Sequence, residues 1–140
     1  MKEVFADTHY WIAIINPGDQ WAEFARAARS KLGQVRIVTT DEVLTEFVTA
    51  LAPYGPQLRE AAVKVVRAIL NNPNVSVVPQ TRQSFLDGVA LYDSRKDKRY
   101  SLTDCISMTT MKTRGITEVL SNDHHFEQEG FIVLIKKEQS

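Results

Sequence analysis

Short apolar segments alternate with longer, helix-like segments along this 140-residue chain. Five apolar segments predict strands, at residues 3–6, 35–38, 75–78, 118–120 and 131–135. The intervening segments repeat apolar residues every three or four positions, which predicts helices at 8–15, 21–32, 43–51, 58–70, 81–92 and 102–114. Strands that alternate with helices favour an α/β fold whose mostly parallel sheet is covered by helices on both faces.

The sequence predicts one domain over residues 1–140, because it contains no internal repeat, linker or low-complexity segment. Lys plus Arg and Asp plus Glu both number 17, so the formal net charge is zero. A protein that coats nucleic acid non-specifically needs excess positive charge, so that class is disfavoured. A nuclease is not excluded, because bound metal ions change the local charge.

The single cysteine, Cys105, cannot form an internal disulfide, and its place on an apolar helix face predicts a small core residue. No segment has the pattern of a signal peptide or of a membrane span. We therefore expect a soluble, cytoplasmic protein without membrane contact.

The helix patterns also predict which side chains are buried. In the helix over 102–114, capped by Ser101 and ended by Gly115, Asp104 should point away from the apolar face. Glu46 should flank the apolar face of its helix, and Glu42 should lie opposite that face. We expect three helices to bury the following side chains: Leu102, Cys105, Ile106, Thr109 and Thr113 in the helix over 102–114; Ala62, Val65, Val66, Ile69 and Leu70 in the helix over 58–70; and Phe85, Val89 and Tyr92 in the helix over 81–92.

Four acidic residues stand where predicted strands end or the helices near them begin. Asp7 ends the first strand and Asp123 follows the fourth. Asp104 opens a helix, and Glu46 lies one turn into another. Because functional sites in open α/β sheets form outside the carboxyl ends of the strands, we expect all four to converge on one edge.

Each acid also has a simpler interpretation. Asp7 and Asp104 could cap helices, Asp123 could stabilise a turn, and Glu46 could be a solvated helix charge. If all four acids were purely structural, four unrelated residues would have to meet at one edge by chance. Converging carboxylates repel unless a cation lies among them, and hard oxygen ligands favour Mg²⁺ or Mn²⁺.

Several segments carry a family resemblance: Phe5-Ala6-Asp7-Thr8; Thr39-Thr40-Asp41-Glu42 followed by Glu46; Ser101-Leu102-Thr103-Asp104-Cys105; and Ser121-Asn122-Asp123-His124-His125-Phe126. Together they resemble a PIN domain, and within that family the stand-alone prokaryotic proteins typified by VapC toxins. The resemblance covers nearly the whole chain. It implies about five parallel strands and a four-acid Mg²⁺ or Mn²⁺ site made by Asp7, Glu46, Asp104 and Asp123. Thr8, Ser121 and Asn122 match positions beside the acids and would orient them.

The resemblance further implies an endoribonuclease that hydrolyses RNA with a divalent metal ion, as the toxin of a toxin–antitoxin pair. Its partners would be RNA, a cognate antitoxin and a second copy of the chain. Two alternatives stay open: a PIN ribonuclease of RNA processing or decay without an antitoxin, and a non-cleaving module that binds RNA or protein. The complete set of four acids argues against the non-cleaving module.

A short basic stretch precedes the helix that carries Asp104. Its cations, Arg95, Lys96, Lys98 and Arg99, could contact RNA phosphates or form a solvated connector. His124 and His125 could contact substrate, although we expect turn and surface residues, since two adjacent histidines do not easily face one metal ion.

Overall fold

A computed structural model describes residues 1–137. The strands are β1 (Glu3–Ala6), β2 (Arg36–Thr40), β3 (Val75–Val78), β4 (Glu118–Leu120) and β5 (Ile132–Val133). The helices are α1 (Thr8–Ile15), α2 (Ala22–Leu32), α3 (Asp41–Leu51), α4 (Pro56–Asn71), α5 (Arg82–Ser94), α6 (Leu102–Arg114) and α7 (His124–Gln128), with a 3₁₀ turn, η1 (Ala52–Tyr54), between α3 and α4.

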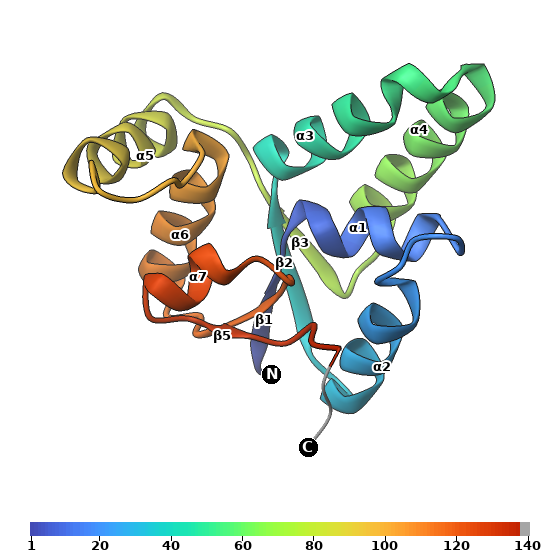
Figure 1. Cartoon of the computed structure of the whole chain (residues 1–140), viewed down its shortest axis with the longest axis horizontal. Helices are drawn as coiled ribbons and strands as arrows, with labels where there is room; N and C mark the ends of the chain where they lie inside the picture. The colour runs from blue at the N-terminus through green and yellow to red at the C-terminus, as the bar shows by residue number, and fades with distance from the viewer. Residues whose placement is uncertain (138–140) are drawn as a thin grey trace.

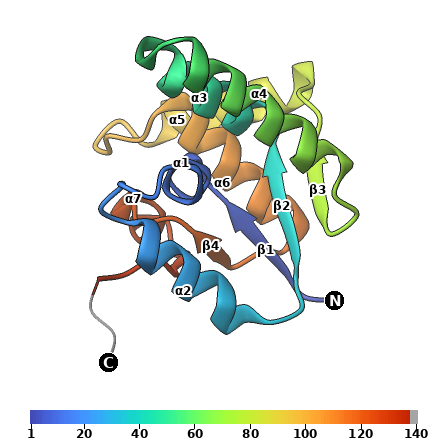
Figure 2. The ribbon, with the colours of Figure 1, turned by 90° about the vertical axis from the view of Figure 1, so that its right-hand side faces the viewer.

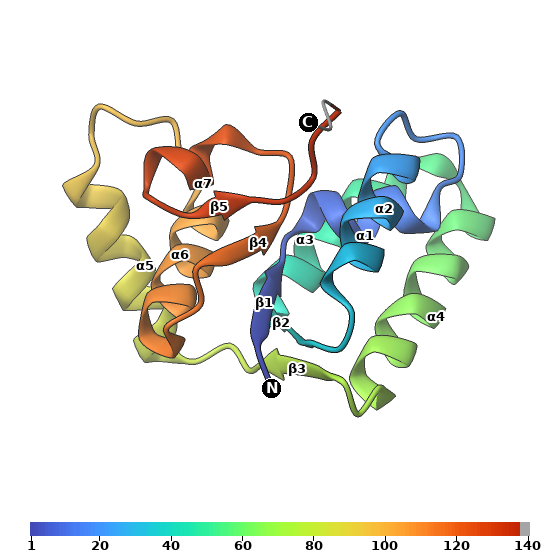
Figure 3. The same cartoon turned by 90° about the horizontal axis from the view of Figure 1, so that it is seen from below.

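The described strands form one sheet in the order β3-β2-β1-β4-β5, and all neighbouring pairs are parallel. Helices α1 to α4 lie on one side of the sheet, and α5 and α6 lie on the other (Figures 1 and 3). This confirms the predicted α/β class and the cover on both faces. In the described part of the chain, no helix is long and apolar enough to span a membrane.

The central strand β1 holds the middle of the core, since Val4, Phe5 and Ala6 are fully buried. Phe5 pairs with Val38 of β2 and with Val119 of β4. The strand directions in Figure 2 carry β1 toward the start of α1 and β2 toward the start of α3. The carboxyl ends of the central strands and the helices that follow them therefore share one edge.

The predicted buried side of α5 is wrong, because Phe85, Val89 and Tyr92 are exposed and Gly88 and Leu91 are buried. Gly88 sets this orientation. A Cβ atom at Gly88 would lie 2.4 Å from the side chain of Ile106 on α6, so only glycine allows the two helices to approach this closely.

Other predictions differ in detail. Leu70 on α4 and Thr113 on α6 are exposed, and β5 is shorter than the predicted strand. The short helix α7 was not predicted. Cys105 is fully buried, which confirms its expected place in the core, and burial raises the pKa of its thiol to about 11.

Candidate active site

Asp7 and Ser121 link the carboxyl ends of neighbouring strands. Asp7 follows β1 and is only 2% exposed. The hydroxyl of Ser121, which follows β4, donates to Asp7 Oδ2 over 3.0 Å and accepts from the backbone N–H of Asp123 over 3.0 Å. The Asp7 side chain makes no capping hydrogen bond to α1, so helix capping does not explain this acid.

The environment of Asp7 disfavours its charged form. Burial is the largest effect, and the nearby charge of Asp104 adds to it. Together they raise the pKa of Asp7 to about 7, although His9 and the Ser121 hydroxyl favour the anion. The raised pKa of Asp7 thus reflects mainly the burial of its carboxylate.

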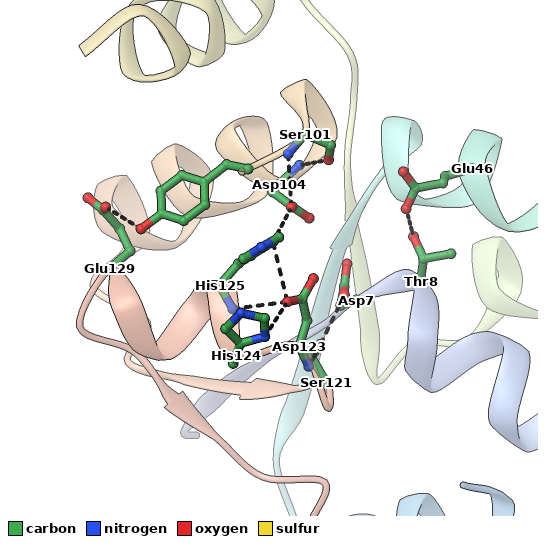
Figure 4. Close-up of polar contacts among 11 residues, drawn as sticks. Asp7, Thr8, Glu46, Ser101, Asp104, Ser121, Asp123, His124, His125 and Glu129 are labelled. Atoms are coloured by element: carbon green, nitrogen blue, oxygen red, sulfur yellow. Dashed lines mark hydrogen bonds and ion pairs between the residues drawn. The ribbon is translucent and has the colours of Figure 1, made fainter. Parts of the chain in front are cut away.

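Asp104 combines a structural role with a place in the site. Its backbone N–H donates to the Ser101 hydroxyl over 3.0 Å, and its Oδ2 accepts from the Ser101 N–H over 3.1 Å, which forms a capping box. Asp104 is buried although it lies opposite the predicted apolar face of α6, and its carboxylate points toward the other acids (Figure 4). Residues 104–108 of α6 are all buried, because α3, α5 and α7 each pack against this helix.

Asp123 likewise caps a helix. Its Oδ1 accepts from the backbone N–H of His125 over 2.9 Å, which starts α7. Asp123 and Asp104 both cap helices, and a capping role is compatible with the predicted site, because each carboxylate keeps a second oxygen.

Glu46 is held from the opposite side of the site. The hydroxyl of Thr8 on α1 donates to Glu46 Oε1 over 2.5 Å, joining α1 to α3. Glu42, one turn earlier on α3, is half-buried, which differs from its expected position opposite the buried face. Its Oε2 is enclosed and has no hydrogen-bond partner among the described residues.

The carboxylates of Asp7, Asp104 and Asp123 point toward a common space, with Glu46 across from them (Figure 4). One oxygen of each acid accepts a hydrogen bond from the protein. The other oxygens of Glu46, Asp104 and Asp123 have no hydrogen-bond partner in the described part of the chain. Each of these three acids is thus fixed by one oxygen and can offer the other to a ligand.

This set of donors fits a hard divalent cation. Carboxylate oxygens are the ligands that Mg²⁺ and Mn²⁺ prefer, and such an ion would favour the charged form of the buried Asp7 carboxylate. The residues that would hold it are Asp7, Glu46, Asp104 and Asp123.

His125 is a site residue that the sequence analysis placed on the surface. Its Nδ1 lies 3.3 Å from Asp104 Oδ2 and 3.4 Å from Asp123 Oδ1. The ring of Tyr100 lies against it, with ring centroids 5.5 Å apart. Both oxygens near His125 also accept capping hydrogen bonds, so the imidazole adds to the groups that orient the two acids.

His124 is exposed, as expected, with 71% of its side chain accessible. One ligand atom from each of Asp123, His124 and His125 lies within 4.8 Å of the other two. The sequence did contain a signal for His125: if Asp123 caps a helix, the residue two positions later must lie in its first turn, beside the cap.

Of the three residues predicted beside the acids, Thr8 and Ser121 each donate to one of them. Asn122 is half-buried and makes no hydrogen bond to the described residues, so its role stays a prediction. In the basic stretch, Arg95 forms a bidentate pair with Glu129, while Lys96 pairs with Asp93 and Lys98 with Asp97.

The fold and the site define a class of protein: a small α/β domain with an acidic centre at the carboxyl edge of a parallel sheet. A family model described as "PIN domain" matches residues 4–131, and the chain belongs to this family. No curated protein sequence matches it significantly.

Three solved structures share this fold. VapC20 of Mycobacterium tuberculosis, described as a toxin that cleaves the sarcin–ricin loop, is 26% identical with a TM-score of 0.84, covering 95% of this chain and 99% of that one. A DNA-bound FitAB structure has a TM-score of 0.71 at 16% identity, covering 97% and 98%. DNA-bound VapBC from Salmonella typhimurium has a TM-score of 0.66 at 17% identity, covering 95% and 97%.

Proposed function

We propose that this protein is a Mg²⁺- or Mn²⁺-dependent endoribonuclease and the toxin of a toxin–antitoxin pair. The observation that carries the proposal is the arrangement of the acids. Asp7, Glu46, Asp104 and Asp123 come from four separate segments, and each is oriented by a protein hydrogen bond. Capping alone explains neither Asp7 nor the meeting of all four.

In the proposed reaction, the four carboxylates would hold a metal ion at the site where an RNA phosphate binds. When bound, such an ion lowers the pKa of water and offsets the charge that develops on the phosphate. Ser121, Thr8 and His125 keep the acids in place, which limits their reorganisation during the reaction.

The partners in this proposal are RNA, a cognate antitoxin and a second copy of the chain. The similarity to VapC20 supports RNA as the substrate, and the similarity to VapBC and FitAB supports an antitoxin. Exposed apolar side chains offer surfaces for protein contacts, and they include Val63, Leu70, Leu86 and Val89 on α4 and α5. RNA as the substrate also places the activity in the cytoplasm.

The test is metal-dependent cleavage of an RNA hairpin that contains the sarcin–ricin loop, with EDTA as the blank. Asp104→Asn keeps the capping ability of residue 104 but removes its charge. Glu46→Gln removes the charge on α3 and keeps an oxygen that can accept from Thr8. We expect each variant to cleave at least ~100-fold more slowly, which corresponds to about 2.7 kcal/mol of transition-state stabilisation.

The matched control is Glu60→Gln, which neutralises an exposed acid on α4 and should cleave like the parent. Parent-like cleavage by both Asp104→Asn and Glu46→Gln would refute the catalytic assignment. If Glu42→Gln cleaves slowly and Glu46→Gln cleaves normally, the acid that α3 contributes to the site is Glu42, one turn earlier, and not Glu46.

A further inference from the structure

A hollow of about 280 Å³ lies between the end of α5 and the start of α6. It is lined by two tyrosines, three cations and one acid: Tyr92, Asp93, Arg95, Lys96, Lys98 and Tyr100. Three of the four cations of the basic stretch identified in the sequence, Arg95, Lys96 and Lys98, therefore line this hollow.

This hollow shares a wall with the acidic centre. Tyr100 lines the hollow, and its ring packs 5.5 Å from the ring of His125, which contacts both Asp104 and Asp123. The next residue, Ser101, makes the capping box with Asp104. An RNA strand whose phosphate lies at the acids would therefore pass beside this hollow.

One side of the hollow is fixed by a buried carboxylate. Glu129 accepts two hydrogen bonds from Arg95, at 3.0 and 2.8 Å, and one each from Lys112 and Tyr100. These bonds hold the connector after α5 against the turn after α7. The charge of Arg95 is thus largely neutralised by Glu129, and the main role of Arg95 is to shape the wall of the hollow.

The other two cations pair with exposed acids, and the side chain of Lys98 is itself 32% accessible. The pair of Lys96 with Asp93 is highly exposed, with 79% and 77% of the two side chains accessible, and Lys98 pairs with its exposed neighbour Asp97 at 3.3 Å. Exposed pairs contribute little to stability, so a phosphate can replace either carboxylate. Tyr92 is 53% exposed and presents an aromatic ring at the rim.

We propose that this hollow binds one unpaired nucleotide of the RNA beside the phosphate held at the acids. Its base stacks on Tyr92, and Lys96 and Lys98 contact its phosphates. The nucleotide must be unpaired, because bases stacked inside an A-form duplex do not expose their faces. The inference rests on the proposed ribonuclease function and adds a nucleotide-binding site outside the acidic centre.

The test is binding of the full-length protein to a short fluorescent single-stranded RNA in EDTA, measured by anisotropy, so that cleavage plays no part. Tyr92→Leu should weaken binding by about 10-fold, since stacking on one aromatic ring contributes ~1–3 kcal/mol per base. Lys98→Gln should weaken binding and flatten its dependence on salt. Phe85→Leu, on the same helix but outside the hollow, is the matched control and should bind like the parent.

A second probe series locates the base. Replacing single bases of the RNA by abasic sites should weaken parent binding at one position, and that loss should disappear in Tyr92→Leu. Equal affinity of Tyr92→Leu and parent, or equally tight binding of the same RNA in a duplex, would overturn the proposal. If the parent cleaves RNA with metal but Tyr92→Leu binds RNA as tightly as the parent, the proposed nucleotide site is wrong and the ribonuclease function stands. Tyr92-dependent binding by a parent that does not cleave would support the hollow and refute the ribonuclease function.

Discussion

Two buried carboxylates, Asp7 and Glu129, lie in opposite electrostatic environments. Glu129 accepts hydrogen bonds from Arg95, Lys112 and Tyr100, and the bond from Arg95 is the main reason that its pKa falls to about 2. Asp7 receives one hydroxyl bond from Ser121 and lies near another acid, and burial raises its pKa to about 7.

The comparison contrasts an acid that is paired with cations of the protein with an acid that is proposed to bind a metal ion. The charge of Glu129 is compensated by cations of the protein itself, so it binds two parts of the chain together. Asp7 forms no ion pair with a lysine or arginine in the described part of the chain, and in the proposed function a metal ion would supply that partner. Burial alone does not distinguish the two; the charge of their neighbours does.

The largest effect should come from Asp7→Asn, which removes the uncompensated charge. We expect RNA cleavage to fall at least ~100-fold while the fold becomes more stable. The folded pKa of Asp7 lies above its ordinary value of 3.8, so the folded parent binds extra protons and loses stability as the pH rises from 3.8 to about 7. The gain in the free energy of unfolding should be on the order of 3 kcal/mol at pH 8 and should disappear toward pH 4.

Urea unfolding of both proteins across this pH range measures the gain. In the parent, millimolar Mn²⁺ should raise the melting temperature, and in Asp7→Asn that rise should shrink. A variant that is less stable than the parent at pH 8 would show that Asp7 is a structural acid like Glu129.

The next largest effect should come from Glu129→Gln, with the opposite sign. The folded pKa of Glu129 is depressed to about 2, so its contribution is complete above its ordinary pKa of 4.5 and is lost as the pH falls toward 2. We expect a loss on the order of 2 kcal/mol at pH 7 that shrinks below pH 4.5. Glu3→Gln, which breaks the partly exposed pair with Arg114, is the control and should cost about 0.5 kcal/mol. An equal loss of unfolding free energy in the two variants would show that Glu129 stabilises the fold no more than a partly exposed ion pair does.

The smallest effect should come from Tyr100→Phe, which tests whether the two regions act separately. The change removes the hydroxyl that donates to Glu129 over 3.0 Å and keeps the ring beside His125. We expect a loss of about 1 kcal/mol in the free energy of unfolding and unchanged cleavage. A fall in cleavage that exceeds the loss of folded protein would show that Glu129 influences the acids through Tyr100 and His125.

Sequence patterns predicted the sheet and most helices because the chain's local preferences agree with the fold. The alternation of segments placed β1 to β4 within one or two residues, and the parallel sheet confirms the fold class. The exposed face of α5 could not be predicted, because it depends on the contact of Gly88 with Ile106, a residue 18 positions away on another helix. Periodicity reports the apolar side of a helix, and on α5 that side is not the packed one.

The four acids could be located from their places at strand and helix ends, and the hydroxyls of Thr8 and Ser121 could be placed beside them. The group of charges around Glu129 could not be predicted. Glu129, Arg95 and Lys112 meet only in the folded chain, and no spacing in the sequence indicates that Glu129 is paired with cations. The contact of His125 with Asp104 depends in the same way on α7, a helix of five residues that is too short to leave a clear pattern.

The position of β1 in the middle of the sheet has a consequence for synthesis. β1 pairs with β2 on one side and with β4 on the other, although β4 begins more than a hundred residues later. A chain that is still being translated can pair β1 with β2, but it leaves the other edge of β1 open and lacks Asp123 until nearly the whole sequence has been made. Contacts between residues so distant in sequence form late in folding. The acidic centre is therefore completed only when synthesis is almost finished. A prematurely terminated chain that ends before residue 118 lacks β4, β5 and Asp123, so both its sheet and its set of acids are incomplete.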